Sequence, residues 1–93
     1  MIKAKTVASL FRYEKRWIQG DYARNIEGLN TNFGGLNARQ WCLAGAIYKV
    51  YPFTWSEMME KIEKLIRGSI IHWNDNPRRT FKQVKALVKK AGI

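Results

Sequence analysis

Residues 41–48, WCLAGAIY, are apolar on nearly every side of a helix, and this stretch sets the expected architecture. A helix that is apolar all round is typical of a central, buried position. Asn37 precedes the stretch, with Gln40 three residues later, in an Asn-led variant of the capping box. The sequence therefore predicts a helix from Asn37 to about Val50. Its small residues at 44–46 favour close packing of a neighbouring backbone, and a ligand is the alternative occupant of that space.

Three further segments carry apolar residues at helical spacing, from about residue 3 to 18, from 54 to 68 and from 80 to 91. Gly20 and Gly68 stand where the first two helices are expected to end, because glycine accepts the left-handed conformation. Capping boxes open the last two of these three segments, Thr54 with Glu57 and Thr80 with Gln83. No segment alternates with a period of two for long enough to predict a strand. We therefore expect a mainly α fold, a compact bundle of about four helices, as one basic domain spanning residues 1–93.

Charge on the third predicted helix is balanced by acid-before-base pairs four residues apart. Such pairs stabilise a helix by about 0.2–0.5 kcal/mol each. The three expected ion pairs are Glu57–Lys61, Glu60–Lys64 and Glu63–Arg67.

The connection between the first two predicted helices, residues 20–37 (GDYARNIEGLNTNFGGLN), holds four glycines and four asparagines. This composition is typical of turns. A structureless connection of this length is uncommon in a small domain and is often a binding or lid element. A short hairpin around residues 27–33 is the competing structural explanation.

Composition limits the classes of function. The single Cys and single His exclude a disulfide framework and argue against a zinc site, so the sequence predicts neither a metal nor a cofactor. The longest apolar run, about residues 41–48, is far shorter than a membrane span, and no signal peptide is evident at the N-terminus. We expect a cytoplasmic protein, in the host cytoplasm if a phage encodes it, with no membrane partner and with its oligomeric state open.

The strongest compositional signal is charge, with 17 basic and 7 acidic residues and a net charge of +10. Such an excess favours a polyanionic partner. On the last predicted helix, Lys82, Lys85 and Lys89 fall on one face, and no acid follows Asp75. If the terminal helices are neighbours, this face and the basic residues near the N-terminus (Lys3, Lys5, Arg12, Lys15 and Arg16) form one surface. The alternative is two separate solvated faces.

A nucleotide-sized ligand needs aromatic faces for a base, arginines for phosphate and amides for polar edges. The long loop and the later turn supply these types, although no Gly-rich phosphate loop of the P-loop class is present. The candidate ligand-binding residues are Tyr22, Arg24, Asn25, Trp73, Asn74, Arg78 and Arg79.

Residues 72–77, HWNDNP, are expected to form a non-helical turn before the last helix. A structural role is favoured for it, in which Trp73 fills the core, Asp75 or Asn74 ties the turn and Pro77 directs the chain into Thr80. Cys42, His72 and Asp75 are the residue types of a nucleophilic triad. Because Cys42 lies in an apolar stretch, where a thiol is usually inert, no catalytic activity is expected.

Three blocks carry a resemblance: WIQGDYA (residues 17–23), WCLAGAI (41–47) and WNDNPRRT (73–80). In their order they resemble a family of small, uncharacterised domains found in bacteria and phages. The resemblance implies a mostly helical domain with its polar blocks near one another, and it is consistent with a phage or prophage origin. It implies no activity.

The sequence as a whole predicts a non-enzymatic binding protein that recognises a phosphate-bearing partner, either a nucleotide-type ligand or nucleic acid. The alternative is a phage-type inhibitor of host defence that acts by contact with a host effector protein.

Overall fold

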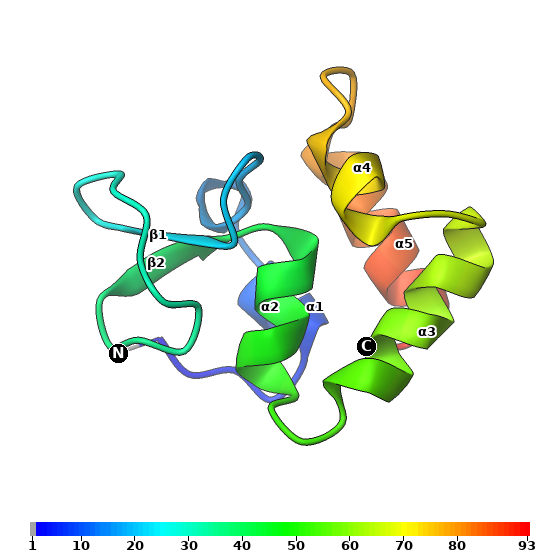
Figure 1. Ribbon diagram of the computed structural model, residues 1–93, viewed down its shortest axis with the longest axis horizontal. Coiled ribbons are helices and arrows are strands. Elements are labelled where there is room, and N and C mark those ends of the chain that lie inside the picture. Colours follow the sequence, from blue (N-terminus) through cyan, green and yellow to red (C-terminus); the bar gives the residue numbers. More distant parts are fainter. Residues whose placement is uncertain (1) are drawn as a thin grey trace.

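A two-stranded antiparallel sheet packs beside five α-helices in the computed structural model, which describes residues 2–93 (Figure 1). The expected mainly α bundle of four helices is therefore wrong, and the fold is mixed. The elements in chain order are α1 (Val7–Leu10), the 3-10 helix η1 (Glu14–Arg16), β1 (Ala23–Asn25), β2 (Ala38–Trp41), α2 (Leu43–Val50), α3 (Trp55–Ile66), α4 (Ile70–Asp75) and α5 (Phe81–Ala91).

The sheet is formed by the two ends of the Gly/Asn-rich segment. Ala23 of β1 lies opposite Trp41 of β2, and both are fully buried. A register irregularity follows Arg24. The short hairpin expected around residues 27–33 lies slightly earlier in the chain, where Arg24 and Asn30 form an antiparallel bridge across a tight turn. In this turn the Asn25 side-chain oxygen accepts hydrogen bonds from the Glu27 and Leu29 N–H groups. Strands of three and four residues are too short to show an alternating pattern, so the sequence did not predict them.

Helix α2 occupies the centre of the molecule, as its apolar sequence predicts (Figure 1). It begins at Leu43 and not at Asn37, because residues 38–41 pair in the sheet. Cys42 caps it by accepting the Gly45 N–H at 3.3 Å. A Cβ on Gly45 would lie 2.0 Å from the Tyr22 carbonyl oxygen, so the small residues serve close backbone packing.

The helix expected from residue 3 to 18 is interrupted. Only α1 and η1 are helical, and Trp17 that follows them is extended. The side chains of Val7, Leu10 and Phe11 are buried in the core, and the chain leaves the α-helical conformation after Leu10. Gly20, with φ of 89°, lies in a loop and ends no helix.

Helix α3 lies within its predicted range, although its two ends differ in detail. The Thr54 side chain makes no capping hydrogen bond, and Arg67, not Gly68, adopts the left-handed conformation. Of the three expected ion pairs, Glu60–Lys64 forms at 3.2 Å, and the other two do not appear among the ion pairs of residues 2–93.

The two C-terminal helices correct one prediction and confirm another. Residues 72–75 belong to α4, so the non-helical turn expected there is wrong; Ser69 caps this helix. Helix α5 begins with the predicted box, in which Thr80 and Gln83 bond each other's backbone N–H, and it ends at left-handed Gly92.

The terminal helices are neighbours. Helix α1 packs against α5, and the Val7 N–H donates to the Ile93 carbonyl at 2.7 Å. The hydroxyl of Tyr51 donates to the same oxygen at 2.7 Å. Among residues 2–93, no helix is long and apolar enough to cross a bilayer.

Candidate functional site

Asn74 is the centre of a buried polar junction. Its side chain is 1% exposed, the only buried polar side chain among the described residues, and it makes four hydrogen bonds. The side-chain oxygen accepts from the Trp17 indole N–H at 2.7 Å and from the Leu43 N–H at 3.0 Å. Since Leu43 opens α2, Asn74 satisfies one of the free N–H groups of that helix.

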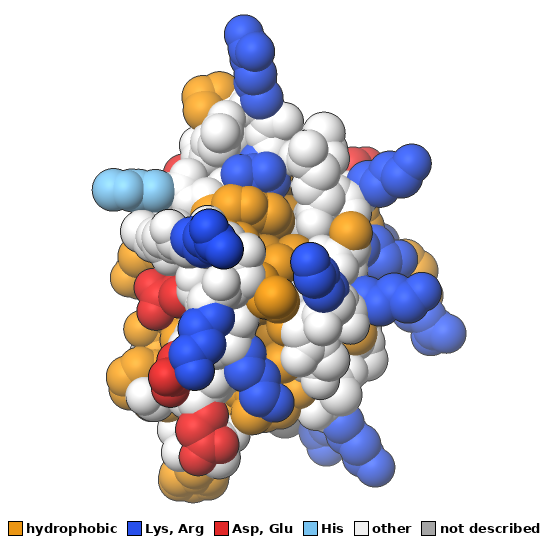
Figure 2. Space-filling model, turned by 90° about the vertical axis from the view of Figure 1, so that its right-hand side faces the viewer, with side chains coloured by type: hydrophobic (Ala, Val, Ile, Leu, Met, Phe, Trp, Pro, Cys, Tyr) orange, Lys and Arg blue, Asp and Glu red, His pale blue; other side chains and the backbone are white. Residues whose placement is uncertain are grey.

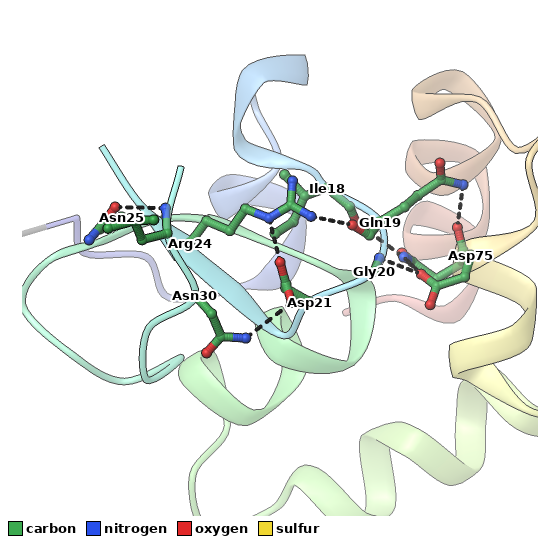
Figure 3. A network of polar contacts seen from close by, with 10 residues as sticks. Ile18, Gln19, Gly20, Asp21, Arg24, Asn25, Asn30 and Asp75 are labelled. Atoms are coloured by element: carbon green, nitrogen blue, oxygen red, sulfur yellow. Dashed lines mark hydrogen bonds and ion pairs between the residues drawn. The ribbon is translucent and has the colours of Figure 1, made fainter. Parts of the chain in front are cut away.

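The amide nitrogen of Asn74 completes the junction. It donates to the Ile18 carbonyl at 3.1 Å and to the Asp75 carboxylate at 2.9 Å. The same Asp75 oxygen accepts the Gly20 N–H at 3.0 Å, and the Gln19 side chain donates to the Asn74 carbonyl (Figure 3). The side chain of Asn74 therefore has no remaining amide hydrogen to offer a ligand.

Trp73 is covered on one face by Arg79. The guanidinium carbon lies 3.8 Å from the ring centroid, within cation–π distance. The Arg79 Nε also donates to the Trp73 carbonyl at 2.8 Å. These contacts lock the turn from α4 to α5, and they leave one indole face unavailable for stacking on a nucleobase.

A second polar group is centred on Asp21, just before β1, and includes Arg24 of β1 and Asn30 after it. Arg24 and Asp21 form an ion pair, and Asn30 donates to the other Asp21 oxygen at 3.1 Å (Figure 3). These hydrogen bonds, Arg24 first, hold the pKa of the Asp21 carboxyl below its ordinary value. The Arg24 guanidinium also donates to the Gln19 carbonyl at 3.0 Å. The Arg24 guanidinium is thus bound to Asp21 and Gln19, which precede it in the chain.

A pocket of about 220 Å³ lies beside the buried junction, with Asp21, Tyr22, Cys42 and Asp75 in its lining. Two of the seven acidic residues of the chain face this small space. The local charge is therefore unfavourable for a phosphate group.

The residues of the possible nucleophilic triad differ in their exposure to solvent. Cys42 is 6% exposed, and burial raises the pKa of its thiol. Its sulfur accepts the Gly45 N–H, and His72 is exposed on α4. A buried thiol with a raised pKa is a poor nucleophile. Among residues 2–93 there is also no cluster of three or more metal-ligating side chains.

A larger concavity, the hairpin groove, lies between η1 and the sheet. It has a volume of about 500 Å³, and Lys15, Arg16 and Arg39 line it together with the single acid Glu27. Asn25 and Gln40 supply amides. Arg39 is held in place by donating to the Leu36 and Ala38 carbonyls at 2.9 and 3.0 Å.

The cations of the hairpin groove have no acidic partners. Within residues 2–93 the ion pairs are Arg24–Asp21 and Lys64–Glu60, and neither involves a groove residue. Lys15 and Arg16 both lie near the Tyr13 ring, at 5.8 and 5.0 Å from its centroid. Their charge is therefore free to attract an anion.

The predicted lysine face of α5 is exposed. Lys82, Lys85 and Lys89 are all solvent-accessible, and basic side chains surround a strip of hydrophobic ones on the face shown in Figure 2. Most of the acidic side chains visible in this view lie toward its lower left edge, and another lies at the upper right.

The comparison with known families gives one match. The family model described as "Family of unknown function (DUF6197)" matches residues 6–92. The chain belongs to this family. No curated protein and no solved structure gives a significant match.

In this member of the DUF6197 family, the three sequence blocks meet at Asn74. Its side chain bonds Trp17 and Ile18 of the first block and Leu43 of the second. Each of the three blocks therefore contributes at least one residue to the junction.

The structure does not bring the seven candidate ligand-binding residues into one site. Tyr22 and Asn74 line the small acidic pocket, whereas Asn25 lines the hairpin groove. Trp73 and Arg79 contact each other, and Arg78 is exposed beside them, where its backbone N–H donates to Asn76.

Asp75 accepts hydrogen bonds from Gly20 and Asn74 and none from the turn that follows it, Thr80 caps α5, and Pro77 is exposed between them. Sequence reasoning missed Arg39 as a candidate ligand-binding residue and did not single out Lys15 and Arg16 as a pair facing it. The sequence feature that could have pointed to this site is the adjacent cationic pair Lys15–Arg16, shortly after Tyr13.

Proposed function

We propose that this domain is a non-catalytic binding protein for a phosphate-bearing ligand of nucleotide size, and that the hairpin groove receives the ligand. The observation that carries the proposal is the convergence of Lys15, Arg16 and Arg39 on one concavity with a single acid. Charge-assisted hydrogen bonds to phosphate are among the stronger polar contacts that proteins make.

The size of the groove favours a small molecule over a nucleic-acid duplex. Ligand pockets usually enclose about 300–1,000 Å³, and this groove of about 500 Å³ falls within that range. Its remaining walls suit the other parts of a nucleotide. Ile2 and Ile26 offer apolar surface for a base, and Gln40 offers an amide for polar edges.

The donors of the groove are partly preorganised. Arg39 is held by two carbonyls, and Arg16 donates to the Leu10 carbonyl at 3.2 Å. The Asn25 side-chain oxygen is occupied by the backbone of its own turn, which fixes the side chain and leaves the NH₂ group as the donor. Donors held in place before binding lose less side-chain entropy when a ligand arrives.

The test is calorimetric titration with a panel of mono-, di-, tri- and cyclic nucleotides, with inorganic phosphate as the minimal probe. We expect saturable binding of at least one nucleotide, with an affinity that falls as salt rises. The variant Lys15→Gln should weaken binding about tenfold, as expected for one charge-assisted contact of about 1.5 kcal/mol. The Lys15 side chain makes no hydrogen bond or ion pair among the described residues, so this substitution should not change the stability of the fold.

Lys61→Gln is the matched control, because Lys61 is exposed on α3 and lies outside the groove. Its affinity should equal that of the wild type. The proposal is refuted if no compound of the panel binds at about 1 mM, or if Lys15→Gln and Lys61→Gln bind equally well. A long single-stranded oligonucleotide that binds without involving Lys15 would instead favour non-specific electrostatic attraction.

A further inference from the structure

A second groove, the α1–α5 groove, lies where the terminal helices pack together. It has a volume of about 420 Å³, and its lining residues are Ala8, Phe11, Lys85, Ala86, Val88 and Lys89. Phe11 and Val88 are 0% and 2% exposed, so they belong to the core beneath the groove, and the exposed alanines Ala8 and Ala86 form its apolar floor. Ala8 and Ala86 are exposed and short, which allows the backbone of another chain to approach closely.

One edge of this groove is strongly basic. Lys85 and Lys89 are four residues apart on α5, so they project from the same side of the helix. Lys82 is exposed one turn before Lys85. No acid occurs after Asp75, and within residues 2–93 none of these lysines forms an ion pair. The groove therefore combines an apolar floor with uncompensated positive charge.

We propose that the α1–α5 groove docks a helical segment of a partner protein that carries an apolar stripe bordered by acidic residues. A helix laid in a groove places side chains at i, i+3, i+4 and i+7 on the floor. Here the alanines leave room for those side chains, and Lys85 and Lys89 face the bordering acids. Charge complementarity of this kind sets the orientation of the partner and the rate of association.

Two other occupants fit the groove less well. A nucleic-acid backbone has no use for an apolar floor, and α5 offers lysines here and not the Arg, Asn and Gln that read base edges. A second copy of this chain, docked symmetrically, would bring two sets of lysines together, and such like-charge contacts are unfavourable. The acidic amphipathic helix is the occupant that satisfies both the floor and the edge.

The probe is a blocked synthetic peptide of about 18 residues, with leucines at helical spacing and glutamates on both sides of them. Binding is measured by fluorescence anisotropy, and amide chemical shifts locate the site. We expect saturable binding that perturbs Ala8, Lys85 and Ala86. A scrambled peptide of the same composition, which lacks the apolar stripe, should bind at least about tenfold more weakly.

Two variants separate charge from shape. Lys85→Glu with Lys89→Glu reverses the charge of the basic edge, and Ala86→Phe fills the groove without changing charge. Each variant should lower the affinity for the peptide at least about tenfold. Lys61→Glu with Lys64→Glu on α3 reverses the same number of charges elsewhere and should retain binding. Circular dichroism and urea unfolding establish that each variant is folded.

The proposal is overturned by any of four results: no binding of the peptide at about 1 mM, equal binding of the scrambled peptide, equal binding by the Ala86→Phe variant, or equal binding by the lysine-reversed groove. A self-associated protein that Ala86→Phe makes monomeric would assign the groove to a second copy. Tighter binding of a single-stranded oligonucleotide, lost on reversal of the α5 lysines, would assign it to nucleic acid. Lys15→Gln should leave peptide binding intact, which separates this site from the hairpin groove.

Discussion

Replacement of Asn74 by alanine should be among the most damaging single changes to this domain. The substitution removes four hydrogen bonds and leaves three groups without their partner: the Trp17 indole N–H, the Leu43 N–H and the Ile18 carbonyl. A buried polar group without a partner costs about 1–3 kcal/mol. The Trp17 side chain is only half-buried, so water can partly replace the hydrogen bond that its indole N–H loses. We therefore expect the free energy of unfolding to fall by about 3–5 kcal/mol, out of a typical 5–15 kcal/mol.

The measurement is urea unfolding followed by tryptophan fluorescence, together with the melting temperature. At roughly 4–8 °C per kcal/mol for a domain of this size, melting should fall by at least about 12 °C. Asn37→Ala is the control, because Asn37 is exposed, and it should change stability by less than about 0.5 kcal/mol. If Asn74→Ala loses less than about 1 kcal/mol, the buried junction does not hold the fold as argued.

Asn74→Asp is a milder variant for the case in which the alanine variant does not fold. It keeps an oxygen for Trp17 and Leu43, but it turns a carboxylate toward the Ile18 carbonyl and toward Asp75. Burial and the neighbouring carboxylate should raise the pKa of this new group in the folded state. Its deficit relative to the wild type should therefore be largest at neutral pH and should shrink as the pH falls toward about 4. A deficit that does not depend on pH would contradict the assigned orientation of the Asn74 side chain.

Three further outcomes are expected. Gly45→Ala should destabilise the domain by about 3 kcal/mol or more, because the added Cβ would collide with the Tyr22 carbonyl; a stable variant by urea unfolding would contradict the close approach of α2 to this backbone. Arg79→Ala should cost about 1–2 kcal/mol through loss of the cation–π contact and the hydrogen bond to Trp73, and Arg79→Lys should recover part of it. Native Cys42 should react with iodoacetamide only slowly at neutral pH, because burial raises the pKa of its thiol; its rate should rise in urea, and fast native labelling would refute burial.

Local signals in the sequence predicted α3, α5 and the buried part of α2, but they did not predict α4. These signals depend only on residues that are close in sequence. They include the capping box of Thr80 and Gln83 and the apolar stretch of residues 43–47, and both are present in the structure. The short strands and the break after α1 depend on distant partners. Ala23 is in a strand because it pairs with Trp41, and no feature of the three residues of β1 predicts that pairing.

The candidate site shows the same limit. The types of residue needed for a phosphate ligand were visible, but their grouping was not, because the hairpin places Arg39 beside Lys15 from positions 24 residues apart. Asn74 was named as a ligand contact because an amide near Trp73 suits a nucleotide. Three of the four partners of its side chain lie 31 to 57 residues away along the chain, beyond the range of any local pattern.

The long sequence separations at the Asn74 junction also bear on the order of folding. Loops of this length must close before Trp17, Leu43 and Asn74 can meet, and closure costs chain entropy before any hydrogen bond forms. Helices α3 and α5 pack against each other across a shorter separation in the sequence and can form earlier. We therefore expect the junction to close after the rate-limiting step, so that its loss accelerates unfolding and leaves the refolding rate nearly unchanged. The residue that joins the three blocks would then govern how long the native state lasts, and not how quickly it is reached.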